Sequence, residues 1–539
     1  MLAGHVQVNI DGKIIYEWAE KVLLDQVSVV QELNQHSWCY IHCRQTEDQR
    51  LPIEEALGKD LVVSTHEEDT GLETVVFDGI IWDVEQTYQV FGTYIARLTG
   101  VTRSYKMDLT PRKAYYLGKP LSAIASELAG HAGLNALCQH PDKRPLNHVQ
   151  WGESDFSFLN RLVDDHGCWM RPTADGIEIS DEFRDTVELK WRDEFGLIEF
   201  TTKGTLGQPS FNGSHYNHHE MKSEVFEKVK DEPAFFGSIS PLVNAVKTQS
   251  QDLPPGYVYQ RSRVVTLDEY QDLLKKESVR SIGGNIRAFG KSARPKLRPG
   301  DKASISGVLD AEGVYGITAV KHQWTAEGYT NDFQCTPWTK YTNPEPPEMK
   351  PWFGAVPARV VEHNDPKKMG RVRVQYFWQQ DGPAYWARMM TPHAGSDRGF
   401  MFMPEVGDEV AVIFEDGDPE RPLVLGCLWN GVDQAPRKDF RGDDVAPNDV
   451  KRIITKSGCR LQFSDKKDQE SIVLATPHTI RIQLIEGATA PNSQGAMLVL
   501  ESSGDIFFSA PNGRIHFKSK YFSREVGDPS QPSDNYYPI

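Results

Sequence analysis

Residues 404–431 read PEVGDEVAVIFEDGDPERPLVLGCLWNG, and this stretch says more about the fold than any other part of the chain. Two segments alternate apolar and polar residues around Asp416 and Gly417, a pattern typical of a β-hairpin with a tight turn. Upstream, residues 371–377 form a further alternating segment, entered through a turn at residues 364–370, and residues 385–389 form a third. Several short strands within about 80 residues, with turn signals between them, predict a small OB-type barrel.

The order of motifs in this region resembles the barrel of the valine-glycine repeat protein G (VgrG) family. The matching motifs are Asn-Asp-Pro at 364–366, Gly-Arg-Val-Arg-Val at 370–374, Trp-Ala-Arg at 386–388, Pro-Glu-Val-Gly-Asp-Glu-Val at 404–410 and Phe-Glu-Asp-Gly-Asp-Pro at 414–419. That family forms the spike of type VI secretion systems, and its relatives are the hub and spike of contractile phage tails and extracellular injection systems. The resemblance therefore implies a structural part of a contractile injection apparatus.

The composition is that of an ordinary globular protein. The chain has 539 residues, of which 39% are hydrophobic and 25% charged, and this length leaves room for three or four domains of usual size. No run of about 18 apolar residues is present, which excludes a membrane-spanning helix. Residues 1–6 have neither a basic start nor an apolar core, so no signal peptide is predicted. Without a signal peptide, another machine would have to carry the protein out of the cell, and the resemblance implies assembly in the bacterial cytoplasm followed by secretion or injection through the apparatus.

The seven cysteines are dispersed, which favours free thiols in a reducing compartment. Only Cys39 and Cys43 are close in sequence, with His42 between them. In an extended segment both cysteines share a face with Ile41, while His42 points the other way. Buried thiols in a β core are therefore favoured over a zinc site.

The net charge of −16 argues against a nucleic-acid partner, because phosphate contacts need a positive surface. Many OB folds bind single strands through basic grooves and stacked aromatic side chains. Here the second barrel segment is followed instead by Glu415, Asp416, Asp418 and Glu420. Oligonucleotide binding is the disfavoured interpretation of this barrel.

Residues 1–345 are predicted to be β-rich with a few helices. Residues 77–84 and 93–98 alternate as paired strands, whereas residues 121–129 and 268–279 have helical patterns. A further helix is predicted to start after Ser154, a natural N-cap followed by an acidic residue. The motifs Glu-Ser-Asp-Phe at 153–156 and Leu-Asn-Arg-Leu at 159–162 resemble the tail-hub half of the family. The resemblance implies barrel-like domains whose three copies form a pseudo-sixfold ring on a hexameric tube.

The C-terminal part is predicted to be a needle. A proline-dense linker at residues 343–351 precedes the barrel, and a second polar linker covers residues 432–448. Short alternating segments then recur at 453–455, 460–463, 471–474, 479–484, 497–500, 505–509 and 514–518. Such strands indicate rungs of a β-helix or β-prism, and three chains wound together would close the edges that one chain leaves open. The segment also resembles the family's needle.

Candidate sites of chemistry are weak. The glycine-rich segment 284–292 has the wrong spacing for a phosphate loop, and an Ala-Arg-Pro sequence follows where its helix should begin. His215, His218 and His219 could hold a metal only in a loop without other ligands. Glu405 and Asp408 could pair as glycosidase carboxylates, but they lie in a turn shared with the family. About 18 residues between barrel and needle are too few for a catalytic domain. We assign no catalytic, cofactor or metal site.

The sequence patterns and the resemblance to the family together predict a mainly β, non-enzymatic homotrimer with β-barrel tail-hub domains, an OB-fold barrel and a trimeric β-helix or β-prism needle. The expected boundaries are 1–345 for the hub, 346–431 for the barrel, 432–448 for a linker, 449–525 for the needle and 526–539 for the tip. The resemblance implies the hexameric inner tube protein and baseplate proteins as partners, effectors, and transient contact with a target membrane. It also implies a Pro-Ala-Ala-Arg (PAAR) repeat cap, which the tip residues Tyr536, Tyr537, Pro538 and Ile539 could contact.

Two alternatives stay open. One is a cell-wall-degrading enzyme or effector delivered with the needle, and the other is an OB-type binding module that works as a monomer. The type of apparatus is also open, because a type VI system, an extracellular particle and a prophage tail would use the same architecture.

Overall fold

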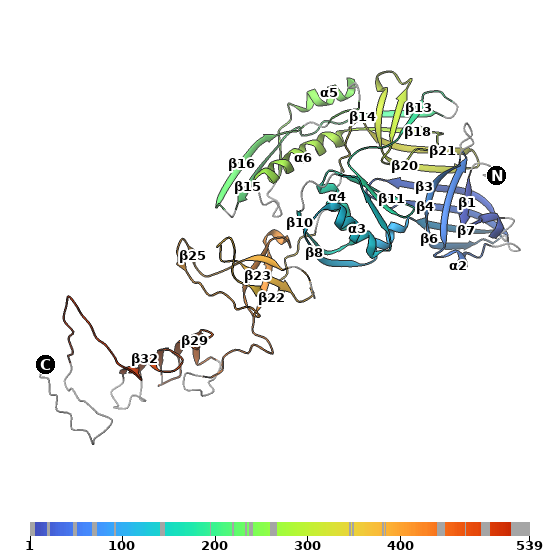
Figure 1. Cartoon of the computed structure of the whole chain (residues 1–539). Helices are drawn as coiled ribbons and strands as arrows, with labels where there is room; N and C mark the ends of the chain where they lie inside the picture. The colour runs from blue at the N-terminus through green and yellow to red at the C-terminus, as the bar shows by residue number, and fades with distance from the viewer. Residues whose placement is uncertain are drawn as a thin grey trace. The chain divides into compact units, whose positions relative to one another are not determined.

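The computed structural model divides into two units, residues 1–428 and residues 429–539 (Figure 1). The described residues are 6–18, 22–46, 51–66, 73–90, 93–140, 146–193, 196–217, 220–231, 234–236, 241–258, 267–343, 347, 350–379, 382, 384–438, 448–468, 470–486 and 496–518.

The first unit is built around one sheet of 13 strands. Its main path runs through β14 (Leu197–Gly204), β18 (Ile286–Ser292), β21 (Gly328–Thr336), β20 (Gly313–Thr325), β3 (Leu23–Glu32), β4 (Trp38–Thr46), β7 (Thr93–Val101), β6 (Glu73–Tyr88), β5 (Asp60–His66), β1 (Gln7–Ile10) and β2 (Lys13–Ile14). Off this path, β13 (Thr186–Lys190) pairs with β19 (Lys302–Ser306), which pairs with β20.

The strand order shows that this sheet contains the same topology twice. In the first repeat the neighbours run β3-β4-β7-β6-β5-β1, and in the second they run β14-β18-β21-β20-β19-β13. Corresponding strands appear in the same sequential order, and the two repeats meet where β20 pairs with β3. One difference is that β1 is antiparallel to β5 whereas β13 is parallel to β19.

Backbone details confirm that the two repeats correspond residue by residue. The Gly58 amide donates to the Ile81 carbonyl at 2.8 Å, and the Gly300 amide donates to the Ile317 carbonyl at 2.9 Å. Both isoleucines also begin a register irregularity with the next strand, before Asp83 in β6 and before Ala319 in β20. A second matched irregularity follows Leu24 in β3 and Leu197 in β14. Two independent bulges at equivalent places fix the alignment of the repeats.

Other elements lie between and within the repeats. An α/β segment separates them and consists of η1 (Arg103–Asp108), β8 (Pro111–Lys119), α3 (Leu121–His131), β9 (Asn135–Cys138), β10 (Leu146–Ser154), α4 (Asp155–Asp165), β11 (Trp169–Thr173) and β12 (Gly176–Ser180). The second repeat contains an insertion between β14 and β18, with β15 (Phe211–Asn217), β16 (Lys222–Val229), α5 (Pro241–Ser250), β17 (Gly256–Val258) and α6 (Leu267–Asn285). Short elements complete this part: α1 (Ile15–Trp18), α2 (Ile53–Ala56) and η2 (Leu309–Ala311).

A closed five-stranded barrel completes the first unit, as the sequence predicts. Its strands are β22 (Val356–Glu362), β23 (Val372–Tyr376), β24 (Tyr385–Met389), β27 (Glu409–Phe414) and β28 (Pro422–Cys427), with a small hairpin of β25 (Ala394–Gly395) and β26 (Arg398–Gly399). The β27–β28 hairpin forms, but its connection is longer than a two-residue turn. Asp416 and Gly417 have φ of 52° and 74° within η3 (Glu415–Gly417), and a second turn follows in which Arg421 donates to the Asp418 carbonyl.

The second unit contains an antiparallel meander of five strands. They are β29 (Val450–Ile454), β30 (Arg460–Ser464), β31 (Ser471–Ala475), β32 (Ile480–Glu486) and β33 (Ala496–Ser502). The alternating segments at 505–509 and 514–518 form no strands, so that part of the strand prediction is wrong. Their aromatic side chains are exposed, among them Phe507 and Phe517, and a lone chain offers them no sheet to pack against.

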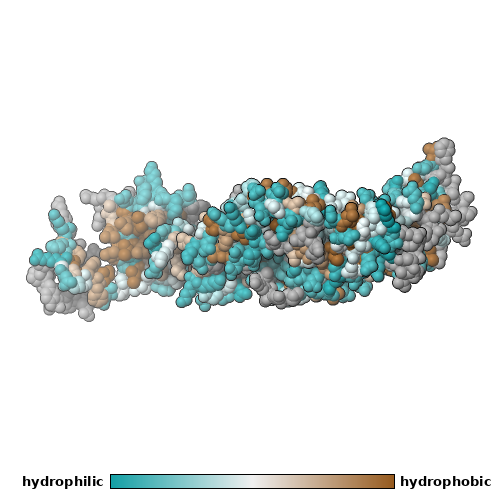
Figure 2. All heavy atoms as spheres, turned by 90° about the horizontal axis from the view of Figure 1, so that it is seen from above, coloured by the Kyte–Doolittle hydropathy of each residue, from teal (hydrophilic) through white to brown (hydrophobic). Residues whose placement is uncertain are grey.

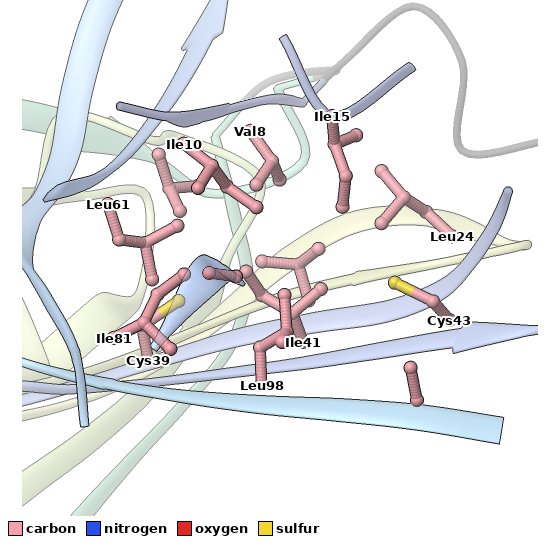
Figure 3. Close-up of a cluster of buried hydrophobic side chains, with 14 of the residues drawn as sticks. Val8, Ile10, Ile15, Leu24, Cys39, Ile41, Cys43, Leu61, Ile81 and Leu98 are labelled. Carbon is pink, nitrogen blue, oxygen red and sulfur yellow. The ribbon is translucent and has the colours of Figure 1, made fainter. Parts of the chain in front are cut away.

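The predicted helices are confirmed as α3, α4 and α6, the last of which is longer than expected. Ser154 is the N-cap of α4, and its hydroxyl accepts from the Ser157 amide at 3.1 Å. Cys39 and Cys43 are buried free thiols that share the core with Ile41, and Figure 3 shows all three directed toward Val8 and Ile10. The prediction that this pair of cysteines forms buried core thiols is therefore confirmed.

His322 lies in the joint between the two repeats and is fully buried, opposite Val29 of β3. Its Nδ1 lies 2.7 Å from the Tyr329 hydroxyl, and burial lowers the pKa of the imidazole from 6.5 to about 3. The unfolded chain therefore binds a proton below pH 6.5 that the folded chain does not bind.

Acidification should lower the free energy of unfolding, because the unfolded chain protonates His322 and the folded chain does not. Between pH 6.5 and pH 4.5, His322 should remove about 1.4 kcal/mol of unfolding free energy per pH unit. Urea unfolding at both pH values measures this, and the His322→Gln variant should show a correspondingly smaller loss than the parent. The matched control is His363→Gln, an exposed histidine of the barrel. An equal acid loss in parent and His322→Gln would contradict the prediction.

Candidate functional site

The hub motif at residues 153–162 builds a polar cluster at the start of α4. The Ser154 hydroxyl, besides capping the helix, donates to Asp108. Asp155 is buried and accepts from Gln150 at 2.8 Å, with His131 Nδ1 at 2.9 Å and the Arg112 guanidinium at 3.2 Å. A buried carboxylate needs such partners because its charge has lost its water.

Arg161 connects this cluster to strand β10. It is 2% exposed, and its Nη2 donates to Glu153 at 2.6 Å and to the Val149 carbonyl at 2.8 Å. The amide of the same Val149 donates to Glu420 of the barrel at 3.1 Å. One residue of β10 therefore makes polar contacts toward α4 and toward the loop between β27 and β28.

Aromatic side chains surround this polar link. Trp151 of β10 meets Phe414 edge-on, with ring centroids 4.9 Å apart, and Tyr115 of β8 lies 4.3 Å from Tyr385. Tyr115, Val149 and Trp151 share one hydrophobic core with the barrel strands. Burial, then the charge of Glu420, raises the pKa of the Tyr385 hydroxyl, which keeps it neutral. We call this cluster of β8, β10, α4 and barrel residues the hub–barrel joint.

The turn that enters the barrel is held by one carboxylate. Asp365 accepts from the amides of Lys367 at 3.0 Å and Met369 at 2.8 Å, and from Arg371 Nη2 at 2.7 Å. The hydrogen bonds from Arg371 hold the pKa of Asp365 well below its usual range. The Asn-Asp-Pro and Gly-Arg motifs therefore specify this turn.

The other predicted candidates are not brought together as reactive sites. Gly284 lies in α6 and residues 286–292 form β18, so the order is helix then strand, the reverse of a phosphate loop. His215 is buried against Tyr270, whereas His218, His219 and the tip residues 536–539 lie outside the described residues. The Glu405 amide donates to Asp408 at 2.9 Å within a turn. Among the described residues, no group of three His, Cys, Asp or Glu side chains could hold a metal ion.

One constellation has the residue types of a hydrolase, which sequence reasoning did not single out because its members are far apart in the chain. His36 lies 2.8 Å from Ser104 Oγ and 2.8 Å from Asp108. Ser104 is fully buried, however, and its hydroxyl is also 3.0 Å from Thr102. A nucleophile has to reach its substrate, so these contacts fasten η1 to the turn after β3.

Comparison with known proteins agrees with this architecture. A model of the type VI secretion system/phage-baseplate injector OB domain matches residues 356–429, and a model of the phage tail baseplate hub (GPD) matches residues 32–178. The chain is a homologue of the VgrG spike and phage tail-hub proteins. The spike protein VgrG4b of Pseudomonas aeruginosa is 31% identical over 179 residues, which are 30% of this chain and 21% of that protein. VgrG1a of the same organism is 22% identical over 475 residues, 80% of this chain and 71% of that protein.

A further relative carries an activity in its name. The actin cross-linking toxin VgrG1 of Vibrio cholerae is 25% identical over 419 residues, 70% of this chain and 37% of the toxin. The chain spans about a fifth of the first two relatives that it matches, VgrG4b and VgrG5. No described helix is long and apolar enough to cross a membrane.

Solved structures share the fold. The E. coli c3393 protein, titled a type VI secretion component similar to the bacteriophage T4 tail proteins gp27 and gp5, aligns with a TM-score of 0.52 and 16% identity, covering 78% of this chain and all of that one. The Francisella PdpA–VgrG complex aligns with a TM-score of 0.59 and 8% identity, covering 92% of this chain and 88% of that chain.

The Asp365 turn should be a stability determinant of the barrel. Asp365→Ala leaves the largely buried Arg371 without its partner and should cost roughly 3 kcal/mol of unfolding free energy. Calorimetry of the full chain measures the loss in the barrel transition. Asp365→Asn keeps one acceptor oxygen and should lose less, and equal losses for the two variants would refute the charge-based account.

The Glu420 contact can be tested at the amide that it accepts from. In Glu420→Ala the Val149 amide loses its acceptor, so hydrogen exchange in peptides covering β10 should accelerate by about tenfold, equivalent to 1.4 kcal/mol. Asp416→Asn, in the same barrel loop, is the control and should leave exchange in β10 unchanged. Unaltered exchange in Glu420→Ala would show that the aromatic contacts alone hold the joint.

Proposed function

We propose that three copies of this chain form the spike of a contractile injection apparatus, which mounts on a hexameric inner tube and pierces a target envelope. Sheath contraction would supply the work, and the chain would act mechanically and without catalysis. In this proposal residues 1–345 form the hub ring, residues 346–431 the collar, residues 432–448 a linker and residues 449–525 the needle.

The observation that carries the proposal is the apolar face of the needle sheet. The register places Ile453, Leu461, Leu474, Ile482 and Leu500 in one row and Phe463, Ile472, Leu484 and Leu498 in the next, on the same face. Leu474 is 53% exposed and Leu498 is 63% exposed. Figure 2 shows apolar atoms gathered on the surface of this segment.

Such a face is not stable in water on its own. An exposed apolar sheet also has open edges, here at β29 and β33, which promote uncontrolled association. Three copies related by a threefold axis would turn these faces inward and supply neighbours for the edges. A single OB-type module leaves this surface unexplained.

The duplication within the sheet favours the proposed contact with a hexameric tube. Each copy offers two equivalent repeats, so three copies present six, which matches the symmetry of a hexameric tube while keeping a threefold needle. The hub–barrel joint would transmit the axial force, because Arg161, Val149 and Glu420 connect α4, β10 and the barrel.

The remaining partners follow from the family. Baseplate proteins would surround the hub, effectors would travel with the spike, and a PAAR-repeat protein would cap the tip. That residues 536–539 contact such a cap stays a prediction. The spike would assemble in the bacterial cytoplasm and leave through the apparatus.

The oligomeric state tests the proposal. Three chains of 60.9 kDa give 182.7 kDa, which light scattering of the full chain should measure. The double variant Ile482→Asp and Leu484→Asp places charges on the apolar face and should reduce the trimer by at least tenfold in association constant, since burying each charge costs several kcal/mol. Ser471→Asp lies on the opposite face and is the matched control.

A monomeric parent chain would end the spike proposal and favour the binding module. A zymogram in which the purified chain cleaves cell wall, including after deletion of residues 449–539, would favour the enzyme.

A further inference from the structure

The two repeats are joined where β20 pairs with β3, and only the second half of β20 takes part in this pairing. The first half of β20 pairs with β19, from Gly313 to Gly316. Past Lys302, the first residue of β19, residues 319–324 of β20 pair antiparallel with residues 27–32 of β3. The Leu33 amide donates to the Thr318 carbonyl at 2.9 Å, so the hydrogen-bonded pairs of this ladder are Gln31–Val320, Val29–His322 and Val27–Trp324.

The equivalent strands outside the joint present the same two edges without a partner strand. The first half of β6 pairs with β5, and among the described residues Asp83–Tyr88 pair with β7 alone. Likewise β14, the equivalent of β3, pairs with β18 and ends the described sheet path. The Thr205 amide donates to Asn285 beside β18, so Gly204, Thr202 and Phe200 direct their backbone groups outward.

We propose that residues 83–88 of one copy pair antiparallel with β14 of the next copy, and that this ladder joins three copies into a ring. The inference rests on the proposed trimer. It transfers the observed β20–β3 register through the two matched bulges, at Ile81/Ile317 and at Leu24/Leu197. The resulting pairs are Asp83–Thr205, Val84–Gly204, Glu85–Lys203, Gln86–Thr202, Thr87–Thr201 and Tyr88–Phe200.

The side chains brought together by this register are compatible. Glu85 meets Lys203, a pair of opposite charges, and Tyr88 meets Phe200, an aromatic pair; cross-strand pairs of both kinds stabilise sheets. Tyr88 is 64% exposed in the isolated chain. Glu85 already contacts Arg97 at 2.6 Å, so Lys203 would complete a row of alternating charge across three strands.

The proposed contact between residues 83–88 and β14 of the next copy can close a ring of copies. It joins two different surfaces, so each copy uses β6 toward one neighbour and β14 toward the other. Around a threefold axis, three such ladders alternate with the three internal β20–β3 ladders. Three hydrogen-bonded pairs per contact would satisfy the backbone groups of Val84, Gln86 and Tyr88 and of their partners.

A disulfide can trap this register in the full chain. Thr87 and Thr201 form a non-hydrogen-bonded pair in the proposed ladder, where Cα atoms lie about 4.5 Å apart, within the range of a disulfide. The double variant Thr87→Cys and Thr201→Cys should therefore form bonds between copies on mild oxidation. On a non-reducing denaturing gel, species of 121.8 and 182.7 kDa, two and three chains of 60.9 kDa, should appear and collapse with a reductant.

The chain supplies its own matched control. Ser28 and Gln323 occupy the same positions in the internal ladder, so Ser28→Cys with Gln323→Cys should form the bond within one copy, without an increase in mass. Thr87→Cys with Lys203→Cys shifts the register by two residues and should give little cross-linking. The parent chain fixes the background from its native cysteines.

A second measurement covers variants that fold poorly. Thr202→Pro removes an amide that the register directs outward, so it should spare the β14–β18 pairing and weaken the ring. Light scattering should show at least a tenfold weaker trimer with unchanged monomer circular dichroism.

The outcomes separate this inference from the proposed function. A trimeric chain in which the internal pair cross-links but the Thr87/Thr201 pair does not would overturn the ladder and leave the spike standing. A trimer of undiminished stability in Thr202→Pro would also overturn it. A monomeric parent chain would end both proposals.

Discussion

The hydrogen-bonding groups along strand edges are the constraint on which the rest of this structure depends. A row of unpaired N–H and C=O groups attracts any available strand, so each edge has to be paired, covered or kept short. The chain pairs one edge internally, where β20 meets β3, and this pairing turns two repeats into one sheet. The same repeats present the equivalent edges at β6 and β14, and the needle presents two more at β29 and β33. In the proposed trimer, association of three copies would pair all of these edges around one threefold axis.

The hub–barrel joint follows from a different constraint, the high free-energy cost of burying charge. Buried Arg161 donates to Glu153 and to the Val149 carbonyl, and buried Asp155 is held by the side chains of Gln150, His131 and Arg112. A buried ion pair is a poor source of net stability, but removal of either partner is costly. Such a cluster therefore specifies how its elements are arranged more than it adds to the net stability. The motif residues fix α4 against β10, and the aromatic cluster of Trp151 and Phe414 holds β10 against the barrel.

Sequence reasoning reached the parts of the fold whose signals are local. The alternation in residues 371–377, the cap at Ser154 and the helical spacing of residues 121–129 each specify an element without help from distant residues. The long hairpin connection was missed because Asp416-Gly417 is a short-turn signal, and the second turn at Asp418 depends on its backbone contacts.

The repeats were also missed. Their equivalence is carried by hydrogen bonds and bulges, at Ile81 and Ile317 for example, while positions such as Gln86 and His322 differ in chemistry. In the hub–barrel joint, the sequence shows Glu420 only as one acidic residue among several, because its partner, the Val149 amide, lies 271 residues away.

The differences between the repeats show what a duplication within one chain allows. In the internal ladder His322 and Trp324 are fully buried, and burial keeps the imidazole neutral. The equivalent positions in the first repeat are Gln86 and Tyr88, which are compatible with water before assembly. An internal joint forms without the translational entropy cost of association, whereas a joint between copies has to overcome that cost and stay soluble beforehand. Six identical subunits would have to use one surface for both purposes. A chain with two linked repeats could keep one joint buried and permanent and form the other only on assembly, while in the proposed spike its C-terminal needle would keep threefold symmetry.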